Sequence, residues 1–193
     1  WMNARRDGAG YLPDPRDPQA SPPSELYVAP RSGGVPRQLT RLGVNVQSAE
    51  WSPDSRRLVL AADAHERDEY TYERADLWTV DLEGQGQVKR LTDDGYYHRA
   101  PSWSPDGRGL VFIRSQGLSV VIASKQNHGS PVDVFRMSAA GGTMENLTAH
   151  WDLIPQSPGY SPDGESVYFS GALGGDGHLF RAGPPGGKVE RVT

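Results

Sequence analysis

The chain of 193 residues contains no cysteine, so disulfides, zinc–thiolate sites and thiol catalysis are excluded within it. It has no apolar run that approaches the roughly 20 residues of a membrane-spanning helix. Basic residues are not in excess either. The formal net charge is −4, which does not favour binding to nucleic acid or to an anionic membrane surface. We therefore expect neither a nucleic-acid partner nor a membrane partner.

Glycine and proline are abundant instead, with 23 and 16 residues and no collagen periodicity. Such a composition is typical of a globular protein with many turns. The length suffices for one large domain or two small ones with a buried core. Because the chain begins with Trp1 and not with methionine, we expect a fragment or a processed product of a longer polypeptide. The lack of a signal peptide then does not identify the compartment.

The stretch WSPDGRGLVFIR, from Trp103 to Arg114, organises the chain. Its Ser-Pro-Asp-Gly segment suits a type I turn, because proline is pre-set for the second position of that turn. The apolar run at residues 110–113 is typical of a strand buried on both faces. Related stretches are WSPDSRRLVLAA from Trp51 and GYSPDGESVYFS from Gly159. The predicted turn residues are Ser52, Pro53, Asp54, Ser104, Pro105, Asp106, Gly107, Ser161, Pro162, Asp163 and Gly164.

A second marker repeats in step with these turns. Leu-Thr or Val-Thr pairs begin at residues 39, 91, 147 and 192, each after a glycine-containing turn. Both markers recur every 45–57 residues. Repeats of this length with four strand signals each indicate the blades of a β-propeller. The sequence therefore predicts an all-β protein of about four blades, each of four antiparallel strands.

The predicted blades cover residues 1–40 (partial), 41–92, 93–148 and 149–193. Long spacers at residues 63–75, 115–131 and 170–177 join the second and third strands of three blades. In a propeller these loops emerge on the face opposite the Ser-Pro-Asp turns. Variation in length is thus concentrated on one face, where functional loops are expected. A further strand is predicted near residues 1–5, followed by a long loop.

The repeat resembles that of TolB-type propellers, in which an aromatic residue precedes Ser-Pro-Asp-Gly and a Gly-Gly turn precedes Leu-Thr. The segments RRDGAGYLPDPRD, LYVAPRSGGVPRQLT and AEWSPDSRRLVLAADAHERDEY are similar to the propeller of prolyl oligopeptidase-family serine peptidases, most of all to the acylaminoacyl-peptidase-like branch. In that family the propeller is a non-catalytic N-terminal domain. An α/β-hydrolase domain with a Ser-Asp-His triad follows it.

The chain departs from the family in extent. It holds about four repeats where seven or eight are usual, and it has no hydrolase domain. The resemblance implies three partners: that hydrolase domain, the remaining blades and a peptide substrate. No catalytic residue can be carried over, since the nearest string to a nucleophile elbow, Gly164 to Tyr168, lacks its second glycine. We expect no cofactor.

Three groups of residues are candidates for contact with a substrate or partner: His65, Glu66 and Arg67; Tyr97, His98 and Arg99; and Trp151. The first group lies in a charged spacer, whose simpler interpretation is a solvated loop. The others lie in connections between blades, where tyrosines also pack on neighbouring loops. Trp151 is the most suggestive, because exposed tryptophan favours interfaces.

No metal site is expected. His65-Glu66 fails as a zinc motif because Glu69 replaces the second histidine. The aspartates Asp54, Asp106 and Asp163 lack the calcium-loop pattern and are expected to cap their own turns.

Three functions remain open. The chain is part of the propeller of a serine peptidase, where it restricts access of peptides; or it is a TolB-type module that binds a protein or peptide; or it is a propeller enzyme with its own central site. The last requires a convergent cluster of carboxylates or histidines, and only scattered candidates are present. The expected location is cytoplasmic, with periplasmic or secreted as alternatives. Because four blades leave two blade faces uncovered, we expect further blades or a second copy of the chain to cover them.

Overall fold

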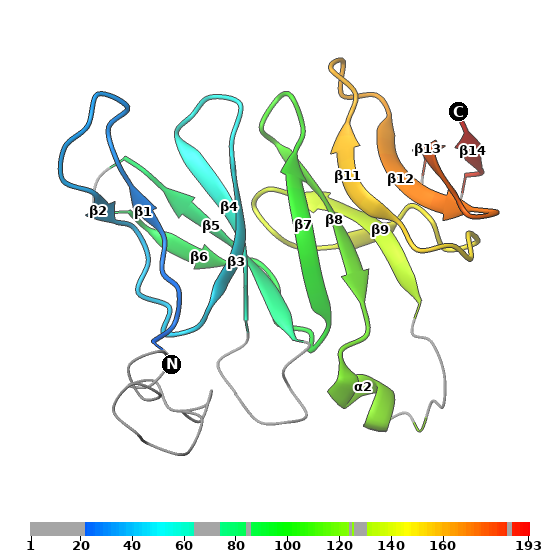
Figure 1. The fold of residues 1–193 in the computed structure, drawn as a ribbon, viewed down its shortest axis with the longest axis horizontal. Coiled ribbons are helices and arrows are strands. Elements are labelled where there is room, and N and C mark those ends of the chain that lie inside the picture. Colours follow the sequence, from blue (N-terminus) through cyan, green and yellow to red (C-terminus); the bar gives the residue numbers. More distant parts are fainter. Residues whose placement is uncertain (1–21, 64–73, 84–85, 124, 126–130, 185–186) are drawn as a thin grey trace.

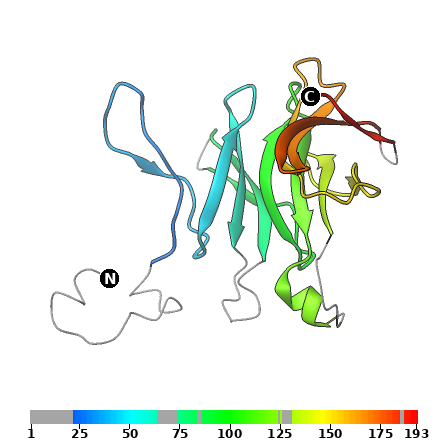
Figure 2. The same ribbon diagram turned by 45° about the vertical axis from the view of Figure 1, so that its right-hand side comes forward.

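The computed structural model describes residues 22–63, 74–83, 86–123, 125, 131–184 and 187–193. These residues form antiparallel sheets that stand side by side, with a single short helix, α2 (Leu118–Ala123). Figures 1 and 2 show the blades in sequence order from one side to the other. The prediction of an all-β propeller is confirmed, and the arc of blades is not closed within the described residues. None of the described helices is long and apolar enough to cross a lipid bilayer.

Three groups of four antiparallel strands correspond to propeller blades, and a parallel pairing of Ala75 with Tyr97 joins the second and third groups into one eight-stranded sheet. The second blade consists of β3 (Val46–Trp51), β4 (Arg57–Asp63), β5 (Ala75–Asp81) and β6 (Val88–Arg90). The third consists of β7 (Tyr97–Trp103), β8 (Gly109–Ser115), β9 (Val132–Ser138) and β10 (Met144–Asn146). The fourth consists of β11 (Gln156–Tyr160), β12 (Val167–Leu173), β13 (Asp176–Ala182) and β14 (Val189–Arg191). Of the first blade the structure describes the pair β1 (Tyr27–Val28) and β2 (Arg37–Gln38).

The Ser-Pro-Asp turns close the hairpin between the first two strands of each blade. In the third blade the Gly107 N–H donates to the Ser104 carbonyl (2.9 Å), and the Gly109 N–H donates to the Ser104 hydroxyl (2.7 Å). Gly107 has φ +67°, a left-handed conformation that favours glycine. Ser55 and Gly164 occupy the same corner with φ +59° and +77°. The same turn geometry therefore recurs in all three hairpins.

The Leu-Thr marker is explained by a hydrogen-bonded latch between the third strand and the end of the fourth. In the second blade the Leu77 N–H donates to the Thr92 hydroxyl (2.9 Å), which donates to Asp76 (3.1 Å). Thr40 and Thr148 make the same two bonds, to Leu26 with Glu25 and to Val134 with Asp133. Each threonine satisfies a backbone donor that the short fourth strand does not reach.

The hydrophobic core lies between blades. Val59, Ala61 and Leu77 of the second blade pack against Trp103 and Phe112 of the third. Val111 and Val134 of the third blade pack against Phe169 and Phe180 of the fourth. The second strand of the second and third blades is buried on both faces, as predicted. Each fully buried valine, leucine or phenylalanine side chain contributes about 1.5–3 kcal/mol to stability through its burial.

Two details differ from the sequence-based expectation. The spacer at residues 115–131 contains helix α2, because Gly117 begins a turn whose carbonyl accepts the N–H groups of Val120 and Val121. The expected spacer at residues 170–177 is mostly strand, with a tight turn at Gly174-Gly175. Both glycines have positive φ, which suits a two-residue hairpin loop. The strand expected near residues 1–5 lies outside the described residues.

Candidate functional site

The blades present two different edges. In Figure 1 the hairpin turns after β3, β7 and β11 lie at the upper edge, which we call the turn face. The ends of β4 and β8 and helix α2 lie at the lower edge, which we call the loop face. Among the candidate contact residues of the sequence analysis, Tyr97, His98 and Arg99 lie on β7, which begins at the loop face. The candidates His65, Glu66 and Arg67 lie outside the described residues.

Tyr97 and Arg99 lie on β7, the first strand of the third blade. The Tyr97 hydroxyl donates to the amide oxygen of Gln47 (3.0 Å), so it joins the first strands of two blades. Arg99 is half-buried, and its Nε has no hydrogen-bond acceptor among the described residues. A β-bulge follows Arg99, and Ala100 there has φ +49°. These two residues remain candidates for contact.

His98 is placed in the interior and not at a contact surface. Its side chain is 0% exposed and packs against Phe112, with ring centroids 5.7 Å apart. Its Nδ1 donates to the Ala75 carbonyl (2.9 Å), and its Nε2 lies 3.5 Å from Asp94. His98 therefore joins the third blade to the second and has no free surface for a partner.

An ion-pair network surrounds His98. Asp94 pairs with Arg114 (2.9 Å), and Arg90 pairs with Asp76 (2.5 Å). Burial alone raises the pKa of Asp94, but the hydrogen bond and charge of His98, the Tyr96 N–H and Arg114 together hold that pKa well below its ordinary value. Atoms of Asp76, Asp94 and His98 lie within 4.8 Å of one another, a spacing that could hold a metal ion. Arginines already pair with both carboxylates, so the network fits a structural link between blades better than a metal centre.

Trp151 is also turned inward. Its ring makes edge-on contacts with Phe169 and Phe180, each with ring centroids 4.9 Å apart. A Cβ atom at Gly171 would lie 2.7 Å from the Trp151 ring, so only glycine permits this packing. Trp151 thus helps to fill the core of the fourth blade, and its side chain is partly buried.

The turn residues behave alike in all three hairpins. Asp54, Asp106 and Asp163 each accept a hydrogen bond from the serine two residues earlier and one from a backbone N–H two residues later. These hydrogen bonds lower the pKa of all three carboxyl groups. The aspartates are therefore ionised caps of their own turns, and they place negative charge along the turn face.

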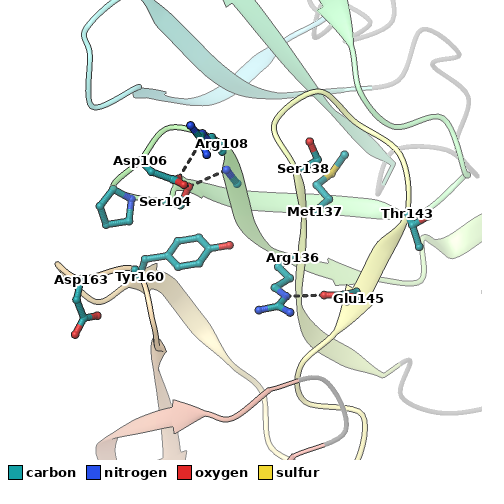
Figure 3. Close-up of a pocket in the computed structure, with 13 residues that line it drawn as sticks. Ser104, Asp106, Arg108, Arg136, Met137, Ser138, Thr143, Glu145, Tyr160 and Asp163 are labelled. Carbon is teal, nitrogen blue, oxygen red and sulfur yellow. Dashed lines mark hydrogen bonds and ion pairs between the residues drawn. The ribbon is translucent and has the colours of Figure 1, made fainter.

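The turn face contains a groove between the third and fourth blades, with a volume of about 750 Å³ (Figure 3). We call it the Tyr160 groove. It is lined by Ser104, Pro105, Asp106, Arg108, Gly109, Arg136, Met137, Ser138, Thr143, Glu145, Tyr160, Asp163 and Gly164. Figure 3 shows the Tyr160 ring reaching between the turn of the third blade and the outer strands β9 and β10.

The groove combines an aromatic ring with charges of both signs. Arg136 donates to Glu145 (2.6 Å), and the Tyr160 hydroxyl lies 3.5 Å from the Leu110 carbonyl. Burial raises the pKa of Tyr160, with Asp106 and Glu145 adding to the shift and Arg136 opposing it, so the phenol stays neutral at physiological pH. The sequence analysis did not single out Arg136, Glu145 or Tyr160 as functional. The feature of the sequence that could have pointed to this groove is Gly109, which occupies the position that Arg57 has in the second blade.

A smaller hollow of about 300 Å³ lies where the first strands of the three blades meet. Its lining includes Glu50, Ser102 and Ser157. Glu50 accepts a hydrogen bond from the Ser102 hydroxyl (3.0 Å), and its backbone carbonyl accepts one from the Trp103 ring nitrogen (3.2 Å). The carboxylate of Glu50 is thus hydrogen-bonded between two blades. The described residues of this hollow contain no convergent cluster of acids or histidines for catalysis.

Comparisons with known proteins place these features in context. No model of a known protein family matches the chain. The uncharacterized peptidase YuxL of Bacillus subtilis is 28% identical over 172 residues, which cover 77% of this chain and 25% of YuxL. The chain thus spans a quarter of that relative's length. YuxL is described as a peptidase, whereas this chain matches only part of it.

Solved structures show the same fold at lower identity. A puromycin hydrolase superposes with a TM-score of 0.65 and 21% identity, over 87% of this chain and 27% of that one. TolB from Acinetobacter baumannii superposes with a TM-score of 0.63 and 22% identity, over 88% and 37%. These neighbours share the arrangement of blades described above. The chain has the fold of a β-propeller segment, similar to the propellers of TolB and of the puromycin hydrolase.

Proposed function

We propose that the chain is part of the propeller of a prolyl oligopeptidase-type serine peptidase and restricts the access of peptides to a hydrolase domain located elsewhere in the polypeptide. The observation that carries this proposal is the similarity to the peptidase YuxL over 77% of the chain. The similarity of fold to puromycin-hydrolysing peptidases supports it. The absence of a nucleophile elbow from this sequence agrees with a non-catalytic role for the segment.

The loop face is the surface that this function would use. The connections between the second and third strands leave the blades there, and one of them carries helix α2. A rigid sheet with variable loops on one edge is a common way to build a selective entrance. Tyr97 and Arg99 lie near this edge at the first strand of the third blade. We propose that these two residues and the segment 65–67 contact either the peptide or the hydrolase domain.

Further blades are the second partner in the proposal. Trp51 is 49% exposed, although its counterpart Trp103 is buried by the preceding blade. At the other end of the arc, Leu179 and Val192 of the fourth blade are also exposed. Uncovered apolar side chains at both ends of a row of blades favour additional blades that continue the ring. A second copy of the chain is the other partner that could cover these ends.

The test uses the longest natural polypeptide that contains this sequence. It should react with a serine-directed fluorophosphonate, and peptide mapping should place the label outside residues 1–193. Combined alanine substitution of His65, Glu66 and Arg67 should change the ratio of activity on a ten-residue peptide to activity on a dipeptide substrate by threefold or more. Combined substitution of Arg56 and Glu83, an exposed ion pair of the second blade, is the matched control and should leave the ratio unchanged.

Two outcomes would contradict the proposal. A fluorophosphonate label on a serine within residues 1–193 would make this segment catalytic. A parent polypeptide without serine hydrolase activity would remove the peptidase assignment altogether and favour a TolB-type binding module.

A further inference from the structure

The repeats allow one position to be compared across two blade junctions. Arg57, Gly109 and Ser166 each lie six residues after the aromatic residue that precedes a Ser-Pro-Asp turn. All three donate their backbone N–H to the serine hydroxyl of their own turn, at 2.9, 2.7 and 3.0 Å. The backbone is thus equivalent in the three blades, and only the side chain differs.

At the junction of the second and third blades, Arg57 fills the space between the two turns. Its guanidinium donates to the Gly107 carbonyl (2.9 Å) across the junction. Its Cζ lies 4.8 Å from the centroid of the Trp103 ring, so the cation also stacks on an aromatic face. A planar cation therefore satisfies this position by a hydrogen bond and a stacking contact together.

At the junction of the third and fourth blades the same position is a glycine. The neighbouring turns approach each other similarly: Gly107 lies beside Pro53, and Gly164 lies beside Pro105. Tyr160 takes the place of Trp103. Gly109 contributes no side chain at this junction, and it lines the Tyr160 groove.

The charges of the groove favour a cation. Asp106 and Asp163 stand on its rim as ionised turn caps, and Glu145 lies on its wall. Of the two cationic residues in the lining, Arg136 is paired with Glu145. With three carboxylates and two arginines, the lining carries a net negative charge.

We propose that the Tyr160 groove binds an arginine side chain of a polypeptide partner, in the position that Arg57 occupies at the preceding junction. The guanidinium stacks on the Tyr160 ring and donates to the Gly164 carbonyl, the counterpart of the Gly107 carbonyl. Arginine is favoured over lysine because a planar guanidinium can stack and donate hydrogen bonds at the same time, whereas an ammonium is a strongly hydrated point charge. This inference concerns the turn face and does not depend on the peptidase proposal.

The first experiment measures binding of acetyl-Gly-Arg-Gly-amide to the full 193-residue chain by amide chemical shifts. We expect saturable shifts at Gly109, Tyr160 and Gly164. The same peptide with lysine should bind at least fivefold more weakly. The peptide with citrulline, which keeps the shape and loses the charge, should bind at least tenfold more weakly. Equal affinity for the arginine and citrulline peptides would overturn the proposal.

The second experiment fills the groove from within. Gly109→Arg restores the residue of the second blade, and we expect it to reduce peptide affinity at least tenfold. Gly109→Ser, which copies the residue at position 166, is the matched control and should reduce affinity less than threefold. A Cβ at this position lies 3.1 Å from the Tyr160 hydroxyl, so both variants require the same small shift. Equal loss of binding in both variants would contradict the proposal.

A third variant keeps the test decisive if Gly109→Arg does not fold. Tyr160→Leu removes the aromatic face and leaves the carboxylates of the rim in place. We expect it to weaken binding of the arginine peptide at least threefold and to narrow its preference over the lysine peptide. An unchanged preference for the arginine peptide over the lysine peptide would show that the Tyr160 ring does not contact the guanidinium, and it would overturn the proposed stacking.

Discussion

Trp51 and Trp103 occupy the same place in consecutive repeats, yet the structure treats them differently. Trp51 is 49% exposed, whereas Trp103 is 5% exposed. The Arg57 guanidinium lies over the Trp103 ring, and the Trp103 ring N–H donates to the Glu50 carbonyl. Arg57 and Glu50 both belong to the preceding blade. For Trp51 the structure describes only the outer strands β1 and β2 of the preceding blade. The same local sequence is therefore core or surface depending on the neighbouring blade.

The largest expected effect tests this difference directly. Trp103→Ala should lower the free energy of unfolding by about 3–5 kcal/mol, the usual cost of removing a buried tryptophan. Trp51→Ala should cost only about 1 kcal/mol, the level of an average substitution. Urea unfolding of both variants of this chain, followed by circular dichroism, gives the two values. Equal losses would mean that the preceding blade does not decide the role of this tryptophan.

The surroundings of His98 provide a second contrast, because this buried ring donates to the Ala75 carbonyl across the junction of the second and third blades and lies beside Asp94. Asp94→Asn should lower the free energy of unfolding at pH 7 by about 1.5–3 kcal/mol, as expected for hydrogen bonds to a charged group. The folded-state pKa of Asp94 is depressed, so its contribution is present above the unfolded value of about 4 and is lost as the pH falls below it.

The difference between wild type and Asp94→Asn should therefore shrink in acid. Unfolding of both proteins in urea at pH 7, 5 and 3 measures this trend. The exposed pair Arg181–Glu190 offers the control, since Glu190→Gln should have little effect at any of these pH values. If the difference in unfolding free energy between the two proteins stays constant down to pH 3, the ionised Asp94 carboxylate does not stabilise this junction.

The turn corners allow a comparison at equal backbone geometry. Gly107→Val should cost about 1–2 kcal/mol, because a β-branched residue must adopt the left-handed conformation at φ +67°. Ser55 already lies at φ +59°, so Ser55→Gly should be neutral or slightly stabilising. Thermal unfolding of both variants tests the prediction. Loss of stability in Ser55→Gly as large as that in Gly107→Val would show that the two turns are not equivalent.

The smallest effect concerns the guanidinium that fills one junction. Arg57→Met keeps much of the aliphatic stem and removes the bond to the Gly107 carbonyl together with the stacking on Trp103. We expect a loss of about 1 kcal/mol. Arg108→Met, on an exposed residue of the next turn, is the control and should change stability by less than about 0.5 kcal/mol. Identical values for the two variants would remove the template on which the proposed arginine site rests.

The fold was predictable because the informative residues act locally. A proline fixes one backbone angle, a glycine permits another, and the spacing of Leu-Thr pairs gives the repeat length. The burial of His98 and Trp151 was not predictable in the same way. His98 is enclosed where the Ala75 carbonyl of another blade accepts a hydrogen bond from its ring, and Trp151 packs inward because Gly171 leaves room for its ring. Both facts depend on residues that are distant in sequence.

The candidate groove shows a different limit. Tyr160 reads as one more aromatic residue before a turn, and Gly109 reads as one more glycine in a hairpin. Their role in the groove becomes visible only when the side chains at positions 57 and 109 are compared at the two blade junctions of the structure. The latch carboxylates Glu25, Asp76 and Asp133 escaped notice for a similar reason. An acid at the start of a strand has no distinctive pattern until its threonine partner is known.

The threonine latch also bears on how such a protein can grow during evolution. All of its atoms belong to one blade, so a gene duplication that copies a repeat copies a complete fastening for the outer edge. The bond from Arg57 to Gly107 belongs instead to a pair of blades and must be established anew wherever a duplicated repeat meets a different neighbour. New junctions therefore begin with unmatched side chains beside intact blades. Grooves such as the one beside Tyr160 are where a growing propeller can acquire a ligand without disturbing its hydrogen-bonded sheets.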